Sequence, residues 1–107
     1  MSELPLEQFA AKAGEAARLL KALSHEARLM VLCQLVDGEH SAGALQEMSG
    51  LSQSALSQHL AKLRDEALVE TRREAQTIYY RLADPNAARV LQTLAAIYCP
   101  PKKKGRK

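Results

Sequence analysis

The stretch Leu51-Ser-Gln-Ser-Ala-Leu-Ser-Gln-His-Leu-Ala-Lys-Leu63 decides how the rest of the chain is interpreted. Ser52 is a favourable N-cap residue, and three leucines then recur at the spacing of one helical face: Leu56, Leu60 and Leu63. The other faces are polar but nearly uncharged, and they carry Gln53, Ser54, Ser57, Gln58 and Lys62. Small hydroxyls and amides suit a helix that lies in a DNA major groove and bonds to base edges. A merely polar surface helix explains the pattern equally well, so the surrounding sequence has to decide.

The length and composition indicate one folded domain. The chain has 107 residues, of which 47% are hydrophobic, and this supports a single modest core. No apolar run approaches the roughly 18 residues of a membrane span, and no signal-peptide pattern opens the sequence. We therefore expect a cytoplasmic protein without a membrane partner. Its two cysteines are expected to be reduced there, so a structural disulfide is not the first interpretation.

The net charge of +3 is unevenly distributed. Five of the fifteen basic residues lie in residues 100–107, which leaves ten basic against twelve acidic side chains, a net charge of −2, in residues 1–99. Any DNA-binding surface must therefore be local. The basic tail could add non-specific attraction to phosphates, but a disordered solubilising end is the favoured interpretation. We expect one domain over residues 1–99 and a disordered basic tail over residues 100–107.

Apolar periodicity predicts three helices ahead of the quoted stretch. The first covers residues 6–23 and is rich in alanine, which suits close packing against a second chain. Ser24 resembles the N-cap of a second helix, which Gly38 ends. Ser41 caps a short third helix, which Gly50 terminates. Two short helices with so tight a connection form a helix-turn-helix pattern, in which the second helix enters the groove.

After the quoted stretch the period changes from helical to alternating. Residues 68–72 and 77–82 are predicted as strands, and the connection 73–76 between them is short and polar. Such a pair forms a hairpin. A hairpin directly after a helix-turn-helix is a wing, whose tip can follow the phosphate backbone or reach the minor groove.

A last helix is predicted from Pro85 to about Tyr98. Asp84 is its N-cap, and proline is favourable at the first helical position. The consecutive prolines after Cys99 cannot continue a helix. The sequence therefore predicts a mainly α fold, a winged helix-turn-helix with four helices before the hairpin and one after it.

This order of elements resembles the arsenic-repressor (ArsR/SmtB) family of winged helix-turn-helix regulators. Three segments carry the resemblance, which covers roughly residues 15–99: Leu20-Lys-Ala-Leu-Ser-His-Glu-Ala-Arg28 leading into Leu32, Leu51 to Leu60, and Leu68 to Leu82. The resemblance implies a homodimer, with the first and last helices at its interface. It also implies that the two recognition helices face successive major grooves of a double-stranded DNA operator.

Members of this family are usually metal sensors. The resemblance would place a Cys-x-Cys near the third helix, or Asp and His ligands along the last helix. The corresponding segment Ser41-Ala-Gly-Ala-Leu45 has no thiol, and the last helix offers Asp84 but no histidine. The histidines at 25, 40 and 59 do not cluster in sequence, whereas zinc needs three or four nitrogen or sulfur ligands. We therefore expect no metal and no cofactor, and a metal-responsive repressor is a less favoured alternative.

The two cysteines point to a different subgroup of the family. Cys33 in the second helix and Cys99 at the end of the last helix resemble the paired thiols of persulfide-responsive repressors and of the vibrio haemolysin-gene activators. The ending Ile97-Tyr98-Cys99-Pro100 is also similar. Taken singly, Cys33 could be a buried small hydrophobe and Cys99 could be incidental.

The resemblance implies that the two thiols face each other within one subunit. A reactive sulfur species or an oxidant would join them directly or through additional sulfurs. A direct disulfide needs Cα atoms about 4.4–6.8 Å apart, whereas a polysulfide tolerates a wider gap. The cross-link would shift the last helix and change the spacing of the two recognition helices. Half-sites lie about one helical turn, roughly 34 Å, apart, so a small rotation lowers DNA affinity.

The polar residues are assigned DNA roles by position. The candidates for base reading are Gln53, Ser54, Ser57 and Gln58, because glutamine can pair bidentately with adenine and serine bonds more permissively. His59 lies nearer the apolar stripe, so packing or a phosphate contact is expected. Lys62 and Arg64 are expected to meet phosphates or solvent. On the wing, the resemblance favours backbone or minor-groove contacts by Arg72, Arg73, Gln76 and Thr77, with a solvated hairpin tip as the alternative.

The leading hypothesis is a dimeric transcriptional regulator, not an enzyme, whose operator binding is controlled by oxidation or persulfide cross-linking of Cys33 and Cys99. The alternative is an activator that displaces a silencing protein, with no or secondary redox control, because repressors and activators need the same helix and wing. A DNA-independent thiol protein or redox enzyme has less support. The sequence contains no Cys-x-x-Cys, no catalytic Ser/His/Asp grouping and no phosphate loop.

Overall fold

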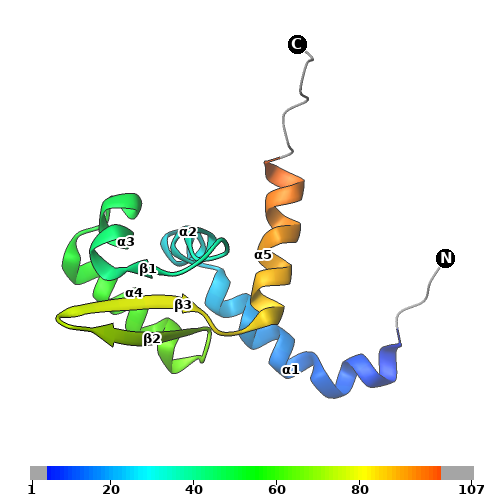
Figure 1. Cartoon of the computed structure of the whole chain (residues 1–107). Helices are drawn as coiled ribbons and strands as arrows, with labels where there is room; N and C mark the ends of the chain where they lie inside the picture. The colour runs from blue at the N-terminus through cyan, green and yellow to red at the C-terminus, as the bar shows by residue number, and fades with distance from the viewer. Residues whose placement is uncertain (1–4, 100–107) are drawn as a thin grey trace, which may run out of the picture.

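The computed structural model describes residues 5–99, which form five helices and a small antiparallel sheet (Figure 1). The helices are α1 (Leu6–Leu23), α2 (Glu26–Gln34), α3 (Ala42–Ser49), α4 (Gln53–Asp65) and α5 (Pro85–Tyr98). The strands are β1 (His40–Ser41), β2 (Val69–Glu74) and β3 (Thr77–Leu82), in the sheet order β1-β3-β2. The predicted winged helix-turn-helix is confirmed.

Side-chain caps start three of the helices where the sequence predicts them. The Ser41 and Ser52 hydroxyls each accept a hydrogen bond from the backbone N–H three residues later, at 3.0 and 3.1 Å. The Asp84 carboxylate accepts one from the backbone N–H two residues later, at 2.8 Å. Each cap satisfies a backbone donor that the first helical turn leaves unpaired. The starts of α3, α4 and α5 are therefore fixed locally.

Helix α2 differs from its prediction at both ends. Its N-cap is His25 rather than Ser24, and the His25 Nδ1 accepts a hydrogen bond from the Ala27 N–H at 3.2 Å. Ser24 instead ends α1, where its hydroxyl donates to the Lys21 carbonyl at 2.8 Å. At the other end α2 stops at Gln34, short of Gly38. The N–H groups of the next two residues bond to carbonyls three residues back, which tightens the chain out of the α-helix.

The hairpin is longer than predicted and gains a third strand. Strand β2 continues to Glu74, which pairs with Thr77, so the predicted connection 73–76 shrinks to a loop of Ala75 and Gln76. Ala75 has a φ of +56°, a left-handed value typical of such two-residue loops. Strand β1 pairs with β3 and was not predicted, because two residues are too few to show an alternating pattern.

A leucine core holds the helices and the sheet together. Leu32, Leu45, Leu63 and Leu91 come from four different helices, and each side chain is at most 1% exposed. Tyr80 adds a buried ring from β3. Burying one leucine contributes roughly 1.5–3 kcal/mol, so this cluster fixes α4 and the sheet as one unit.

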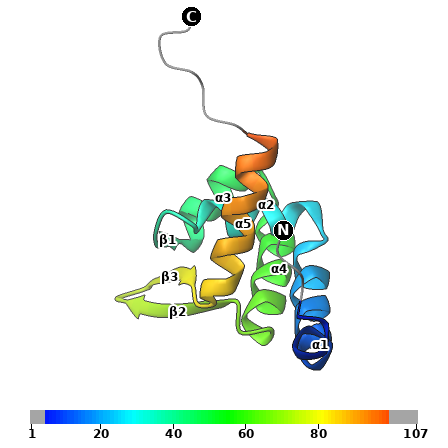
Figure 2. The same cartoon turned by 90° about the vertical axis from the view of Figure 1, so that its right-hand side faces the viewer.

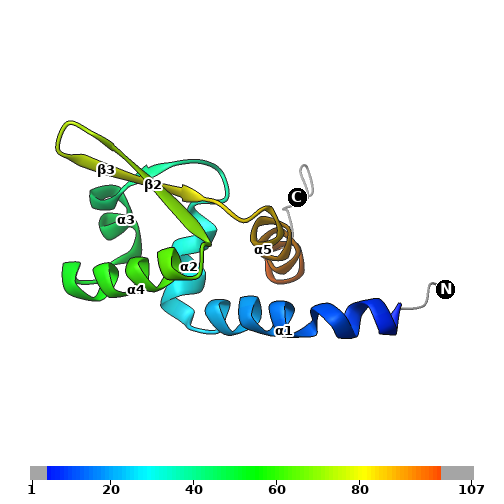
Figure 3. The same ribbon diagram turned by 90° about the horizontal axis from the view of Figure 1, so that it is seen from below.

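The wing and helix α1 extend from opposite sides of the molecule. All three views show this separation (Figures 1 to 3), and the third shows α4 at the same end as the wing. Helix α5 lies at the α1 end in the first and third views. None of the described helices combines the length and apolarity that spanning a membrane requires.

Candidate nucleic-acid interface

The connection between α3 and α4 is a short, internally bonded turn. Gly50 ends α3 in the left-handed conformation, with a φ of +71°, and its N–H bonds to the Gln46 carbonyl at 3.0 Å. The Ser49 hydroxyl accepts a hydrogen bond from the Leu51 N–H at 3.1 Å. Glycine suits this turn because side chains rarely tolerate a positive φ. The turn therefore sets the direction in which α4 leaves α3.

Helix α4 divides into a buried and an exposed face, as predicted. Leu56, Leu60 and Leu63 are at most 3% exposed and join the core. The four candidates for base reading all lie exposed on the other side of the helix: Gln53, Ser54, Ser57 and Gln58. The exposed face thus begins with uncharged hydrogen-bonding groups, which is the chemistry that base edges require.

The end of α4 adds positive charge to this polar face. Lys62 and Arg64 lie exposed in its last turn. Within residues 5–99 neither side chain takes part in an ion pair. Cations in this turn also complement the negative end of the helix dipole. Both side chains are available to an anionic partner.

Beyond Glu66, α4 ends in a Schellman motif. The Leu68 N–H bonds to the Leu63 carbonyl, and the Ala67 N–H to the Arg64 carbonyl, both at 2.9 Å. This motif requires a left-handed residue, and Ala67 supplies it with a φ of +62°. Leu63 and Leu68 occupy the two positions whose apolar side chains often accompany the motif, and both are buried.

His59 lies on the packing side of α4, as predicted. Its half-buried ring is 4.6 Å from the His25 ring, centroid to centroid, at an interplanar angle of 59°. Burial lowers the pKa of His59, and the positive charges of His25 and Arg28 lower it further. Arg28 is held nearby, since its Nε donates to the Ala22 carbonyl at 3.0 Å. His59 therefore connects α4 to the start of α2.

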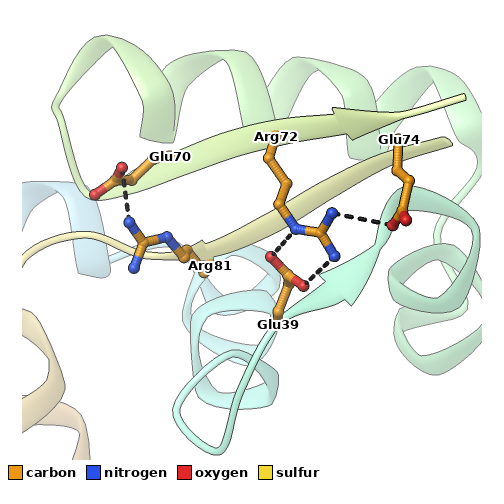
Figure 4. Close-up of polar contacts among 5 residues, drawn as sticks. All are labelled: Glu39, Glu70, Arg72, Glu74 and Arg81. Carbon is orange, nitrogen blue, oxygen red and sulfur yellow. Dashed lines mark hydrogen bonds and ion pairs between the residues drawn. The ribbon is translucent and has the colours of Figure 1, made fainter.

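On the wing, Arg72 is bound by two carboxylates (Figure 4). Its Nε and Nη2 donate to the two Glu39 oxygens at 2.8 and 2.9 Å, and its Nη1 donates to Glu74 at 3.0 Å. The guanidinium also lies 4.5 Å from the centre of the Tyr79 ring. The hydrogen bond from Arg72 lowers the pKa of Glu39. No local sequence pattern marks Glu39 as a partner of Arg72, because the two residues are 33 positions apart.

The other predicted wing residues are exposed near the hairpin tip. Arg73 is the last but one residue of β2, Gln76 belongs to the loop, and Thr77 begins β3. Within residues 5–99, Arg73 takes part in no ion pair. The tip therefore presents one unpaired cation and two polar side chains.

The two thiols lie away from this surface. Cys33 is half-buried in α2, Cys99 is exposed at the end of α5, and both are free. Burial raises the pKa of Cys33, and the neighbouring Cys99 raises it further. Both causes disfavour the thiolate form of Cys33. Within residues 5–99, no three His, Cys, Asp or Glu side chains gather as a metal site would require.

Comparison with known proteins identifies relatives along almost the whole chain. The family model described as bacterial regulatory protein, arsR family, matches residues 25–71. A biofilm growth-associated repressor of Agrobacterium fabrum is 47% identical over 102 residues, which are 95% of this chain and 87% of that protein. The transcriptional activator HlyU of Vibrio cholerae is 46% identical over 94 residues, 88% of this chain and 87% of that protein.

Solved structures give the same result. The transcriptional repressor BigR from Xylella fastidiosa superimposes with a TM-score of 0.87 at 44% identity, covering 92% of this chain and 100% of that chain. A homodimeric winged helix-turn-helix DNA-binding domain, Mb0332 from Mycobacterium bovis, has a TM-score of 0.72 at 32% identity. It covers 91% of this chain and 89% of that one.

Proposed function

Since the chain belongs to the ArsR family of bacterial DNA-binding transcriptional regulators, we propose that it binds its operator as a homodimer and reads base edges with α4. The observation that carries the proposal is the exposed row of amides and hydroxyls on α4: Gln53, Ser54, Ser57 and Gln58. Solvated helix faces usually carry charges, whereas base reading needs short donors and acceptors near the helix axis.

Positively charged side chains around α4 supply the phosphate contacts. Lys62 and Arg64 follow the polar row along the same helix, and Arg73 reaches out from the wing. Gln76 and Thr77 at the wing tip bond to the backbone or the minor groove, and His59 contributes packing or one phosphate contact. Because residues 1–99 carry a net charge of −2, binding depends on these few local cations.

The dimer surface is formed by exposed apolar side chains of α1 and α5. Large apolar side chains lie exposed on these two helices: Leu6, Phe9, Leu20, Ile97 and Tyr98. Large exposed apolar patches mark sites where proteins bind a partner. The homodimeric Mycobacterium bovis domain supports a second copy of the chain as that partner. The two α4 helices then face half-sites about one helical turn apart.

Sedimentation tests the dimer surface. We expect Phe9→Glu to give a monomer with much weaker DNA binding, because it places a charge in the interface. Met48→Glu is the matched control, since Met48 is an exposed apolar residue on α3, and this variant should stay dimeric. A Phe9→Glu protein that remains a dimer with unchanged affinity would overturn this part of the proposal.

We further propose that oxidation or persulfide attack on Cys33 and Cys99 controls DNA binding. One thiolate attacks the outer sulfur of a persulfide and releases a thiol. The other thiolate then attacks the cysteine sulfur so modified, which forms the Cys33–Cys99 disulfide and releases hydrogen sulfide. The raising of the Cys33 pKa by Cys99 supports this pairing of the two thiols. An ion pair at 3.1 Å joins Arg18 of α1 to Glu66 at the end of α4. A shift of α1 in the dimer would therefore also move the end of α4.

Two measurements on the same samples test this control. DNA affinity is measured for the reduced protein before and after persulfide treatment, on a duplex selected by the protein from a random pool. Mass spectrometry then identifies the cross-link and any inserted sulfur. We expect treatment to weaken binding by wild type but not by Cys33→Ser or Cys99→Ser. Unchanged wild-type affinity, or a Cys33→Ser variant that still responds, would contradict redox control.

Activation is a second candidate function, because the similar HlyU protein of Vibrio cholerae is named a transcriptional activator. An activator of this kind displaces a silencing protein from DNA and needs the same α4 and wing. Transcription from the selected site, measured with and without a nucleoid silencing protein, separates the two. Repression lowers transcription in both cases, whereas displacement raises it only when the silencer is present.

A further inference from the structure

The Arg72 side chain crosses the middle strand of the sheet. Arg72 lies on β2 opposite Tyr79 of β3, and Glu39 directly precedes β1 on the far side of β3. To reach Glu39, the guanidinium passes over the Tyr79 ring, at 4.5 Å from its centre. Figure 4 shows this crossing from the wing to the segment before β1. One side chain thus joins both edges of the sheet.

The guanidinium uses most of its bonding capacity within the protein. An arginine guanidinium has five N–H donors, and in Arg72 three of them donate to Glu39 and Glu74. The pair with Glu39 is bidentate, which is the strongest and most directional form of this contact. Only two N–H donors of Arg72 are left for another partner, and two carboxylates already balance its positive charge.

The surface around Arg72 is also unfavourable for DNA. Glu70 and Arg81 form a second ion pair beside it, at 3.1 Å (Figure 4). The cluster of Glu39, Glu70, Glu74, Arg72 and Arg81 therefore contains three carboxylates and two guanidinium groups, a net charge of −1. A net negative surface repels the phosphate backbone.

Arg73 points to the opposite face of the hairpin. Successive side chains of a strand alternate between faces, so Arg73 shares its face with Val69 and not with Arg72. Val69 is buried in the core, at 4% exposure, so this is the face of the hairpin that packs on the rest of the domain. The unpaired cation of the wing therefore lies on the opposite face of the hairpin from the cluster of Glu39, Arg72 and Glu74.

We propose that Arg72 is a positioning residue, which ties the wing to the segment entering α3 through Glu39 and does not itself contact DNA. Glu39 stands two residues before Ser41, the N-cap of α3. The bond therefore fixes the wing relative to the helix-turn-helix, so that Arg73 and α4 meet one duplex together. This inference rests on the DNA face proposed above and assigns Arg72 a different role from the contact expected of it.

The salt dependence of DNA affinity separates positioning from contact. Each lost phosphate contact reduces the slope of log affinity against log salt by about one, hence by about two for a dimer with two wings. We compare Arg72→Gln with Arg73→Gln, which removes the same charge one residue away. On a selected duplex, Arg72→Gln should bind severalfold more weakly with an unchanged slope. Arg73→Gln should lose about two from the slope.

Glu39→Gln provides the reciprocal test. If Arg72 positions the wing, Glu39→Gln weakens DNA binding severalfold. The double variant Glu39→Gln with Arg72→Gln then binds DNA no less tightly than the single variant of lower affinity, because both substitutions remove the same Arg72–Glu39 ion pair. Glu70→Gln, which removes a wing carboxylate without touching Arg72, controls for net charge. Arg72 and Glu39 side chains are 51% and 30% exposed, so none of these changes empties the core.

The Arg72 and Glu39 variants test the positioning role of Arg72, and the Arg73 variant tests the proposed DNA face. A smaller slope for Arg72→Gln, or tighter binding by Glu39→Gln than by Glu70→Gln, would make Arg72 a phosphate contact and overturn the positioning role. Unchanged affinity in both Arg72→Gln and Glu39→Gln would also overturn it. An unchanged slope in Arg73→Gln would instead overturn the proposed DNA face, while the two Arg72–Glu39 variants still report on the wing.

Discussion

The His59 ring of α4 lies 4.6 Å from the ring of His25, the N-cap of α2. The His25 Nδ1 accepts the bond from the Ala27 N–H, so this cap requires an unprotonated Nδ1. Two histidines at this distance cannot both be charged without repulsion. Protonation of the His59 ring is therefore expected to weaken this contact between α4 and α2.

The first prediction concerns stability below neutral pH. The pKa of His59 is lowered below its ordinary value of 6.5, so the unfolded chain takes up this proton at a higher pH than the folded chain does. Stability from His59 is complete above about pH 6.5 and is lost as pH falls through the folded-state pKa. Urea unfolding between about pH 7.5 and 5.5 should show a smaller loss for His59→Asn than for wild type. His40→Asn is the control and should lose as much unfolding free energy as wild type over this pH range. A His59→Asn protein that loses as much as wild type would contradict the prediction.

The second prediction concerns the Schellman motif that ends α4. Ala67→Gly should stabilise the protein by about 0.5–1 kcal/mol, because glycine removes the cost of a left-handed alanine at some loss of backbone entropy. Ala61→Gly in the exposed middle of α4 is the matched control and should destabilise by about 1 kcal/mol. Denaturant unfolding measures both changes in stability. Destabilisation by Ala67→Gly would show that the left-handed conformation of Ala67 does not lower the stability of the protein.

The third prediction concerns the reactivity of Cys33. Because burial and Cys99 raise its pKa, the rate of alkylation should inflect at a higher pH than that of a small free thiol. Cys99→Ser removes the second cause only, so the inflection should move down but stay above that of the free thiol. Alkylation followed by mass spectrometry at several pH values measures this. An inflection unaffected by Cys99→Ser would mean that the two sulfurs do not interact.

Local signals explain how much of the fold was predictable. The Ser41, Ser52 and Asp84 caps lie directly before the helices that they start, and the three buried leucines of α4 follow a helical period. Such features depend on neighbours within a few residues. The helices, the hairpin and the exposed face of α4 therefore followed from the sequence.

Features that depend on distant partners did not follow from it. Serine is a favourable N-cap residue, so the sequence favours Ser24 as the cap of α2. In the structure His25 caps α2, and its ring lies against the ring of the distant His59. The bonds from Arg72 to Glu39 join residues 33 positions apart, and no local pattern marks either one as a partner. For the candidate site, sequence identified which residues are polar and exposed, whereas only the fold shows which of them are already bound.

The most direct test of base reading by α4 compares affinity for a selected duplex with affinity for an unrelated one. Gln58→Ala in the reduced protein should lower affinity for the selected duplex by about 1–3 kcal/mol per half-site and leave the unrelated duplex unchanged. Lys62→Ala should weaken both duplexes equally, and Gln92→Ala on the exposed side of α5 should change neither. If the ratio of the two affinities stays at the wild-type value when Gln53, Ser54, Ser57 and Gln58 are all replaced by alanine, α4 does not read the operator.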